Sequence, residues 1–250
     1  MFPIIPANSV AASGNDEGIF GFGYTGSYTA VSNLVSNAGV VATDVTGVGT
    51  ARSGIAACEY GGDKGIFGYG TTGSNVSLTN LFSNAGVVSS DVTGVGSARQ
   101  QLGACEYGGD KGIFGFGESG GSKVGMTNLV SNAGVVTSDV SAVGTGRNNI
   151  AACKYGEDTG IFGYGATGDY ISTSNLVSNA GVIASDTTGV GQGRSTLAAC
   201  EYGRDKGIFG YGGGHAQYSV TNLVSNTGVI ASDTTGVGTA RSQLAACSFN

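Results

Sequence analysis

The segment Ile66–Gly70 reads Ile-Phe-Gly-Tyr-Gly, and it recurs five times in the 250-residue sequence with tyrosine or phenylalanine at its fourth position. The copies begin 47 or 48 residues apart, at Ile19, Ile66, Ile113, Ile161 and Ile208. In an extended strand, successive side chains point to opposite faces, so isoleucine and the glycines share one face and the aromatic residues the other. Glycine leaves room on its face for an apolar side chain from a neighbouring sheet. The motif therefore predicts a stack of closely packed small sheets.

Each repeat divides into four short extended segments separated by turn residues. In one repeat these are Gly54–Tyr60, Lys64–Gly70, Val76–Phe82 and Val87–Ser90. Four strands in a period of about 47 residues is the pattern of a propeller blade. The composition agrees, because 48 glycines and only 11% charged residues suit tight β-turns and disfavour helices.

The sequence thus predicts an all-β, five-bladed β-propeller of four-stranded antiparallel blades. The first repeat begins at a second strand, and the last segment, Arg241–Asn250, matches a first strand. Joining Asn250 to Asn15 keeps the repeat in phase, so we expect the ring to be closed by the C-terminal strand. Residues 15–250 form the predicted propeller. Residues 1–14 are predicted to be an apolar N-terminal arm that docks a partner, and a frayed terminus is the alternative.

Charge and targeting signals restrict the partners. The net charge is −6 and is spread over the repeats, so no basic patch suited to nucleic acid is present. The N-terminal segment has no positive residue and is interrupted by Pro3 and Pro6, unlike a signal peptide or a membrane span. We expect a protein made in the cytoplasm without membrane insertion.

Residues with chemical reactivity follow the repeat and do not form one asymmetric cluster. The five cysteines, Cys58, Cys105, Cys153, Cys200 and Cys247, occupy equivalent positions and are expected to be buried free thiols too far apart for disulfides. His215 is the only histidine, which excludes multi-histidine metal sites. The sequence predicts no catalytic residue, no metal site and no cofactor, and hence no enzyme.

An aspartate stands eight residues before each repeat arginine, as Asp91 does before Arg99. We interpret this recurring pair as a structural bond that pins the loop between its two members.

Variation between repeats is concentrated in two segments: the loop after the second strand and the residue pair after the repeat arginine. In a four-stranded blade these two connections emerge at the same rim, and loops on a rigid scaffold commonly carry recognition. Drift in exposed loops would produce the same variation. The candidate ligand-binding residues on this rim are Tyr24, Tyr28, Asn75, Lys123, Tyr170, His215 and Tyr218.

Two features resemble the kelch repeat of β-propellers, and the resemblance covers residues 15–250. One is an arginine separated by two residues from Leu-Ala-Ala, as in Arg194–Ala199, and the other is a second strand that ends in glycines. The chain departs from kelch repeats in its split glycine doublet and in having no tryptophan, and histidine ligands for a kelch-type copper oxidase are absent. Segments such as Asp63–Gly70 and Thr79–Val88 are also similar to repeat proteins of tailed bacteriophages.

The phage resemblance implies a virion-associated tail or fibre component that binds a cell-surface glycan or protein. The alternatives are a structural module that docks other virion proteins through the N-terminal arm, and a lectin-like propeller. The lectin tachylectin shares the blade number, but its tryptophan-rich pockets have no counterpart here. An artificial consensus repeat protein would have more uniform loops than this chain has.

Overall fold

The computed structural model describes residues 17–248, which form strands and turns and contain no helix. Each repeat contributes one small antiparallel sheet, numbered here from 1 to 5 along the chain. Sheet 1 comprises β1 (Gly18–Tyr24) and β2 (Tyr28–Val35); sheet 2, β3 (Ala56–Tyr60), β4 (Lys64–Gly68) and β5 (Thr79–Phe82); sheet 3, β6 (Gly103–Tyr107), β7 (Lys111–Gly115) and β10 (Thr127–Val130). Sheet 4 comprises β11 (Ala151–Tyr155), β12 (Thr159–Gly163) and β13 (Ser174–Val177), and sheet 5, β14 (Ala198–Tyr202), β15 (Lys206–Gly210) and β16 (Thr221–Val224). A hairpin of β8 (Glu118–Ser119) and β9 (Ser122–Lys123) is added to the third repeat. The predicted all-β class is confirmed.

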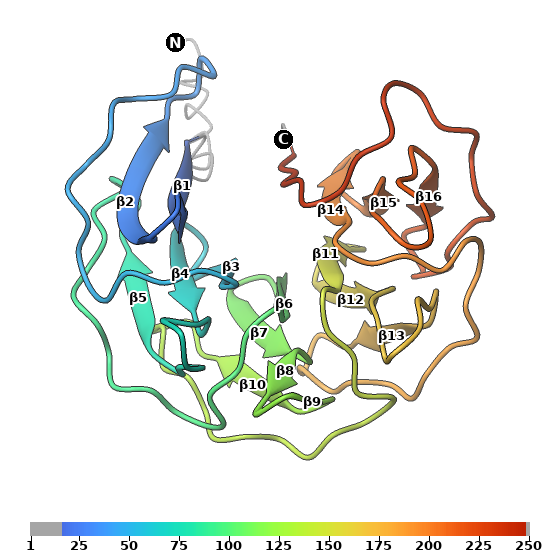
Figure 1. The fold of residues 1–250 in the computed structure, drawn as a ribbon, viewed down its shortest axis with the longest axis horizontal. Coiled ribbons are helices and arrows are strands. Elements are labelled where there is room, and N and C mark those ends of the chain that lie inside the picture. Colours follow the sequence, from blue (N-terminus) through green and yellow to red (C-terminus); the bar gives the residue numbers. More distant parts are fainter. Residues whose placement is uncertain (1–16, 249–250) are drawn as a thin grey trace, which may run out of the picture.

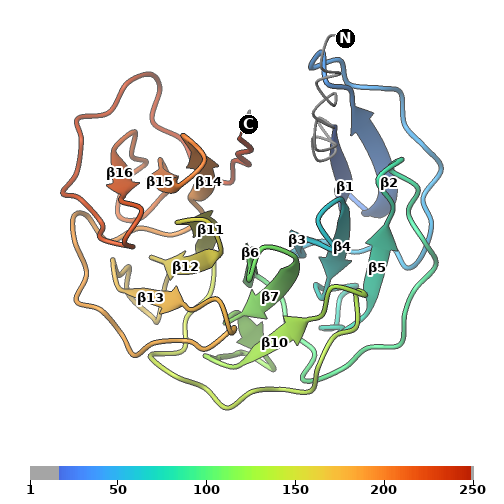
Figure 2. The same cartoon turned by 180° about the vertical axis from the view of Figure 1, so that it is seen from behind.

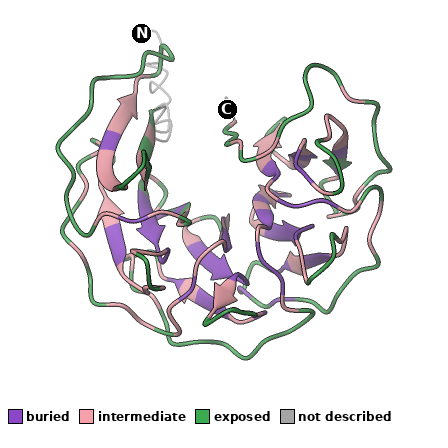
Figure 3. Cartoon of the chain, in the orientation of Figure 1, coloured by how far each residue is buried: buried purple, intermediate pink, exposed green. Residues whose placement is uncertain are grey.

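The five sheets follow one another around a common centre, and the arrangement is open between sheet 5 and sheet 1 (Figure 1, Figure 2). The first strands β3, β6, β11 and β14 lie innermost and contact one another in that order. Burial is concentrated in the inner and middle strands, whereas the outermost connections are exposed (Figure 3).

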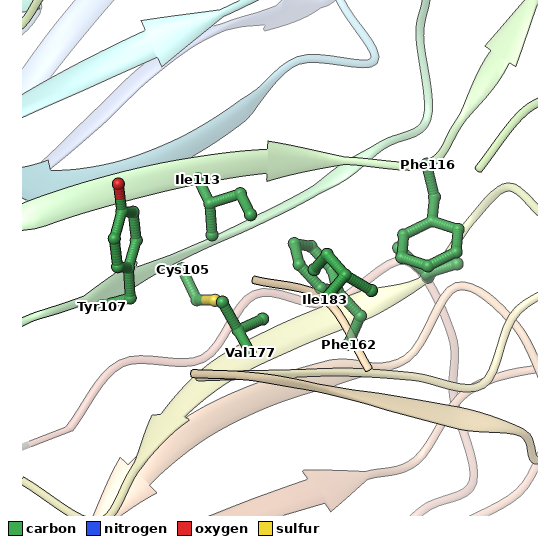
Figure 4. Packing of buried hydrophobic residues seen from close by; sticks show 8 residues of the cluster. Cys105, Tyr107, Ile113, Phe116, Phe162, Val177 and Ile183 are labelled. Atoms are coloured by element: carbon green, nitrogen blue, oxygen red, sulfur yellow. The ribbon is translucent and has the colours of Figure 1, made fainter. Parts of the chain in front are cut away.

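The apolar cores lie between neighbouring sheets. One core joins Cys105 and Ile113 of sheet 3 to Phe162 and Val177 of sheet 4 (Figure 4). Each sheet therefore depends on its neighbours for burial of both faces.

Glycine in the recurring motif is required by this packing. A Cβ atom at Gly68 would lie 2.6 Å from the ring of Phe114 in the next sheet, and one at Gly115 would lie 2.8 Å from the ring of Phe162. Cβ atoms in proteins do not approach other atoms so closely, so the phenylalanine ring occupies the place of a side chain. The predicted packing against the glycine face is confirmed.

The second strand is shorter than predicted, because the aromatic residue after Gly68 leaves the extended conformation. Tyr69 has φ of +63°, and its equivalents Phe22, Phe116, Tyr164 and Tyr211 have φ of 60–62°. This left-handed conformation costs a bulky residue roughly 1–3 kcal/mol. It is held by two hydrogen bonds: the Tyr69 amide donates to Leu78 O (2.9 Å), and Tyr69 O accepts from Arg52 Nε (2.8 Å).

The repeat arginines join adjacent sheets. Arg52, Arg99, Arg147 and Arg194 are completely buried. The guanidinium of Arg99 stacks on the ring of Tyr69 in the preceding sheet, 4.1 Å from its centroid. Within its own sheet Arg99 donates from Nε to Phe116 O (3.0 Å) and from Nη2 to Asn128 Oδ1 (2.6 Å). We call this set of contacts the arginine clamp.

The predicted bond between each arginine and the aspartate eight residues before it is wrong. Arg52 forms its ion pair with Asp91, at the far end of the same repeat, at 3.8 Å, and Arg99 pairs likewise with Asp139. The carboxylate of Asp91 also accepts hydrogen bonds from Thr50 N and Oγ1 (3.0 and 2.6 Å) and from Asn80 Nδ2 (2.9 Å). The aspartate therefore completes the clamp and fixes the segment that leads into the arginine.

The predicted fourth strand is reduced to isolated bridges, such as Phe82↔Val88 and Thr79↔Val92. Between them the Asn80 side chain donates to Ser89 O (3.0 Å), which takes that carbonyl out of a regular backbone ladder. Each sheet therefore has two or three strands flanked by an irregular outer segment.

The predicted closing strand is not formed among the described residues. β1 pairs with β2 alone, and residues 241–248 belong to no strand. The predicted arm, residues 1–14, lies outside the described residues. Within residues 17–248 there is no helix long and apolar enough to cross a membrane.

Candidate binding rim

In sheets 2 to 5 the two variable segments lie side by side, as predicted. Ser53 bridges to Thr71, and the same pairing joins Gln100 to Glu118, Asn148 to Ala166 and Ser195 to Gly213. In sheet 2 this bridge consists of Ser53 N to Thr71 O (3.1 Å) and Thr71 N to Ser53 O (2.8 Å). We call the surface formed by these loops the rim.

At the inner edge of the rim a chain of backbone hydrogen bonds passes from sheet to sheet. Gln101 N donates to Gly54 O (2.9 Å), Asn149 N to Gln101 O (2.9 Å), Thr196 N to Asn149 O (2.9 Å) and Gln243 N to Thr196 O (2.8 Å). These residues have φ between 51° and 63°. Sequence analysis missed this belt of backbone hydrogen bonds, because a backbone interaction requires no common side chain at the five positions.

Three of the seven predicted rim residues come together between sheets 4 and 5. The rings of Tyr170 and His215 meet edge to face, with centroids 5.4 Å apart. Gly214 lies between two tyrosines, since a Cβ there would be 3.1 Å from the Tyr218 ring and 3.4 Å from the Tyr170 ring. Asp169 Oδ1 is 3.7 Å from His215 Nε2, and both side chains are 78% exposed. The result is an aromatic cluster in which Tyr170 and His215 are exposed and Tyr218 is half-buried, with adjacent hydrogen-bonding groups.

Tyr24 and Tyr28 form a second aromatic pair at the turn of sheet 1. Their ring centroids are 5.4 Å apart, and Tyr24 is 63% exposed. The strand pairing is irregular between Gly21 and Gly23, and the pairing resumes with Gly23 opposite Thr29 and Tyr24 opposite Tyr28.

The remaining two predicted residues do not join either aromatic group. Asn75 donates from Nδ2 to Glu118 O (2.9 Å) and thereby ties the rim of sheet 2 to that of sheet 3. Lys123 lies in β9, opposite Glu118 in the added hairpin. A neighbouring polar cluster was missed by sequence analysis: Asn148 Nδ2 donates to Gln101 Oε1 (2.8 Å) and Glu118 Oε2 (3.1 Å).

Charged side chains gather on the inner strands. Lys154 Nζ lies 3.2 Å from Glu106 Oε2 and 3.6 Å from Glu201 Oε2. Burial raises the pKa of Glu201, and the charge of Lys154 acts in the opposite direction. Glu106, Lys154 and Glu201 occupy equivalent positions of successive repeats. Sequence analysis did not identify them as one group, because the charge at this position changes between repeats.

The cysteines differ in burial. All five are free thiols, as predicted, and Cys58, Cys105 and Cys153 are buried. The predicted burial is wrong for the other two, because Cys200 is half-buried and Cys247 is exposed. Removal from water raises the pKa of Cys153 to about 12, so its thiolate is scarce at neutral pH. Within the described part of the chain, no group of three histidine, cysteine, aspartate or glutamate side chains is placed to hold a metal ion.

No protein-family model matches this chain, and a search of curated proteins likewise finds no match.

Proposed function

We propose that the protein is a non-enzymatic attachment module, a five-bladed β-propeller closed by its C-terminal strand, whose rim binds a cell-surface glycan. The principal observation in support is the partly exposed cluster of Tyr170, His215 and Tyr218 on a scaffold that otherwise repeats. Tyrosine offers a flat apolar face together with a hydroxyl group, which suits the apolar faces and hydroxyl groups of a sugar. Asp169 and His215 add hydrogen-bonding groups beside the rings.

A glycan array tests this assignment. We expect the triple variant Tyr28→Ala, Tyr170→Ala, Tyr218→Ala to lose about tenfold or more in affinity for the bound glycans, because each stacking contact contributes on the order of 1 kcal/mol. Glu157→Ala is the matched control, since Glu157 is exposed in a turn at the opposite end of the strands. Binding that survives all three tyrosine replacements would remove the rim from consideration.

We further propose that the protein acts as part of a virion, after synthesis in the cytoplasm of the infected cell. The support is the resemblance of its repeats to phage repeat proteins. Mass spectrometry of purified particles tests the proposal: peptides of this chain should be present in stoichiometric amount, and their absence from particles would contradict it.

A second candidate function is a docking module for other virion proteins. It is favoured by one exposed valine at the same position of every repeat: Val40, Val87, Val135, Val182 and Val229 are 63–67% exposed. Replacing Val87, Val135 and Val182 by serine should then reduce incorporation into particles and leave glycan binding intact. Deletion of residues 1–14 separates the contribution of the predicted arm from that of the valines.

A further inference from the structure

Four junctions between adjacent sheets share one set of contacts, and the fifth position lacks them. At each formed junction a phenylalanine ring covers a glycine of the preceding sheet: Phe67 covers Gly21, Phe114 covers Gly68, Phe162 covers Gly115 and Phe209 covers Gly163. Gly210 of sheet 5 has only Thr221 near its Cβ position, and Phe20 of sheet 1 is 53% exposed. Phe20 is the equivalent of a side chain that is at most 4% exposed in the other four sheets.

Arg241 makes only half of the arginine clamp. Its guanidinium stacks on Tyr211 of sheet 5 at 3.8 Å, and its Nη1 donates to Thr239 O (3.1 Å). In the four complete clamps the arginine also binds a left-handed aromatic carbonyl, an asparagine and an aspartate. Among the described residues Arg241 has none of these three partners and is exposed.

Sheet 1 holds the three groups that Arg241 lacks. Phe22 has the left-handed conformation that presents its carbonyl, with φ of +62°. Asn33 Nδ2 donates to Asp44 Oδ1 (2.7 Å), as Asn80 does to Asp91, but no arginine donates to Asn33 Oδ1 among the described residues. Sheet 1 therefore has the acceptor groups of an arginine clamp without the arginine, and Arg241 is an arginine without these acceptor groups. The two sets of groups are complementary.

We propose that the edge of β1 that no described strand covers, together with Phe22 O, Asn33 and Asp44, is a strand-acceptor site whose occupant is residues 241–248 of the same chain. The inference deepens the closed ring of the proposed function and rests on it. The register follows from β3 and β4, where Ala56 pairs with Gly68 and Cys58 with Ile66. Accordingly Ala245 pairs with Gly21, Cys247 with Ile19 and Ser248 with Gly18. Arg241 then binds Phe22 O, Asn33 and Asp44.

The occupant comes from the same chain because sheet 5 already holds the segment at its start. Gly212 N donates to Arg241 O (2.9 Å), and Gln243 N donates to Thr196 O (2.8 Å). The same two bonds precede the first strands β6, β11 and β14, as Gly70 N to Arg99 O and Gln101 N to Gly54 O do before β6. Such tethering gives the segment a high effective concentration at the neighbouring sheet, which favours it over the same segment of a second copy.

Phe82 occupies part of the acceptor region. It stands where the other sheets carry valine, and its ring covers Gly65, whose equivalent Gly112 is covered by Cys58 Sγ. Entry of Cys247 therefore requires the Phe82 ring to turn away from Gly65. The variant Phe82→Val should remove this obstacle and keep the closed arrangement.

A disulfide between sheets 1 and 5 tests the site. A Cβ at Gly112 would lie 2.5 Å from Cys58 Sγ, and one at Gly160 would lie 2.6 Å from Cys105 Sγ. These separations are close to disulfide geometry, so a cysteine at position 18 bonds to Cys200 when sheets 5 and 1 are adjacent in the same manner. Gly112→Cys is the matched control, because its partner Cys58 is adjacent whether the ring is open or closed.

The full chain carrying Gly18→Cys is treated with a mild oxidant and analysed by non-reducing electrophoresis and peptide mass spectrometry. We expect a disulfide from position 18 to Cys200 within one chain, in a yield similar to that of the control. A disulfide between two chains would show that the site takes the segment of a second copy. No disulfide at position 18, when the control forms one, would show that the ring is open. Both results would overturn the proposal.

Thermal unfolding of Arg241→Ala provides an independent readout. In the closed ring Arg241 is buried like the other four, so the melting temperature should fall by roughly 10 °C. An unchanged melting temperature would overturn the proposal. Glycan binding measured on the oxidised Gly18→Cys protein distinguishes the two proposals. A closed ring that binds no glycan refutes only the binding rim. An open ring that binds glycan refutes the acceptor site and the closure of the ring, but not the binding rim.

Discussion

At the residue scale, the arginine clamp explains how a conserved internal repeat joins separate sheets. Arg147 is wholly buried, and removal from water lowers its pKa to about 10 despite the opposing charge of Asp186. Hydrogen bonds to Tyr164 O, Thr145 O and Asn175 Oδ1 offset this cost, as does stacking on Phe116. A planar group with several fixed donors is needed to make these contacts together, and lysine has no such group.

We predict that Arg147→Ala lowers the free energy of unfolding by about 3–5 kcal/mol, because it leaves Asn175 and Asp186 without their buried partner. Arg147→Lys should recover only a minor part of this loss, since an ammonium group neither stacks flat nor binds bidentately. Urea denaturation measures both variants. Arg204→Ala, at an exposed arginine, is the control and should change stability by less than about 0.5 kcal/mol. Equal stability of the lysine variant and the wild type would contradict the clamp.

The aspartates of the clamp should make stability depend on acid pH. Burial acts to raise the pKa of Asp186, but hydrogen bonds from Thr145 and Asn175 and the charge of Arg147 outweigh it, so the pKa is lowered. The pKa values of Asp91 and Asp139 are lowered in the same way. A carboxylate with a lowered folded pKa stabilises the fold above its unfolded pKa of about 4, and this contribution is lost as pH falls through the folded pKa.

We therefore expect the free energy of unfolding to fall steadily from about pH 5 to pH 2. Asp186→Asn should be less stable than the wild type at pH 7 and should show a shallower decline in acid. Urea titrations across this pH range measure both slopes. Identical slopes for the two proteins would exclude Asp186 as a source of the dependence.

The residue-scale contacts were only partly predictable from the sequence. The recurrence of arginine and aspartate indicated a structural bond, but proximity in sequence suggested the wrong partner. The correct partner, as in Arg52 with Asp91, depends on the two ends of a repeat meeting in space. The left-handed Tyr69 was also unpredictable, because the hydrogen bonds that hold it come from residues distant in sequence.

At the element scale, the pairing of glycine with phenylalanine sets the distance between sheets. The alternation within Ile66–Gly70 predicted this packing correctly, since it follows from strand geometry alone. The sequence did not reveal that the fourth segment pairs only at isolated positions. That outcome depends on Asn80, because its side chain donates a hydrogen bond to Ser89 O. In a regular strand that carbonyl would accept a backbone hydrogen bond.

Two glycine variants test the sheet packing and the closed ring together. Gly115→Ala places a methyl group 2.8 Å from the Phe162 ring and should destabilise the protein by about 1–3 kcal/mol. Gly210→Ala has an open Cβ position unless Phe20 covers it. We predict that both variants lose similar stability, as measured by thermal unfolding. A stable Gly210→Ala protein beside a destabilised Gly115→Ala protein would contradict closure.

At the scale of the whole molecule, the five repeats predicted a closed ring of five blades. The structure places one small antiparallel sheet per repeat around a common centre and leaves the arrangement open between sheet 5 and sheet 1 (Figure 1). The period of the repeat was sufficient to predict neighbouring sheets around a centre, because each repeat needs a neighbour to bury its faces. The rim was found by comparing repeats, but the meeting of Tyr170, His215 and Tyr218 required the spatial adjacency of sheets 4 and 5. Closure is the whole-molecule feature on which the acceptor-site proposal depends.

The most direct test of closure is the reactivity of the native cysteines toward iodoacetamide, followed for each thiol by peptide mass spectrometry. Cys153 is buried between sheets, whereas Cys247 is exposed when residues 241–248 lie apart from sheet 1. The closed ring predicts that Cys247 in the wild-type protein reacts as slowly as Cys153, and that both react rapidly after denaturation. Rapid labelling of Cys247 in the native protein, with Cys153 still protected, would contradict it.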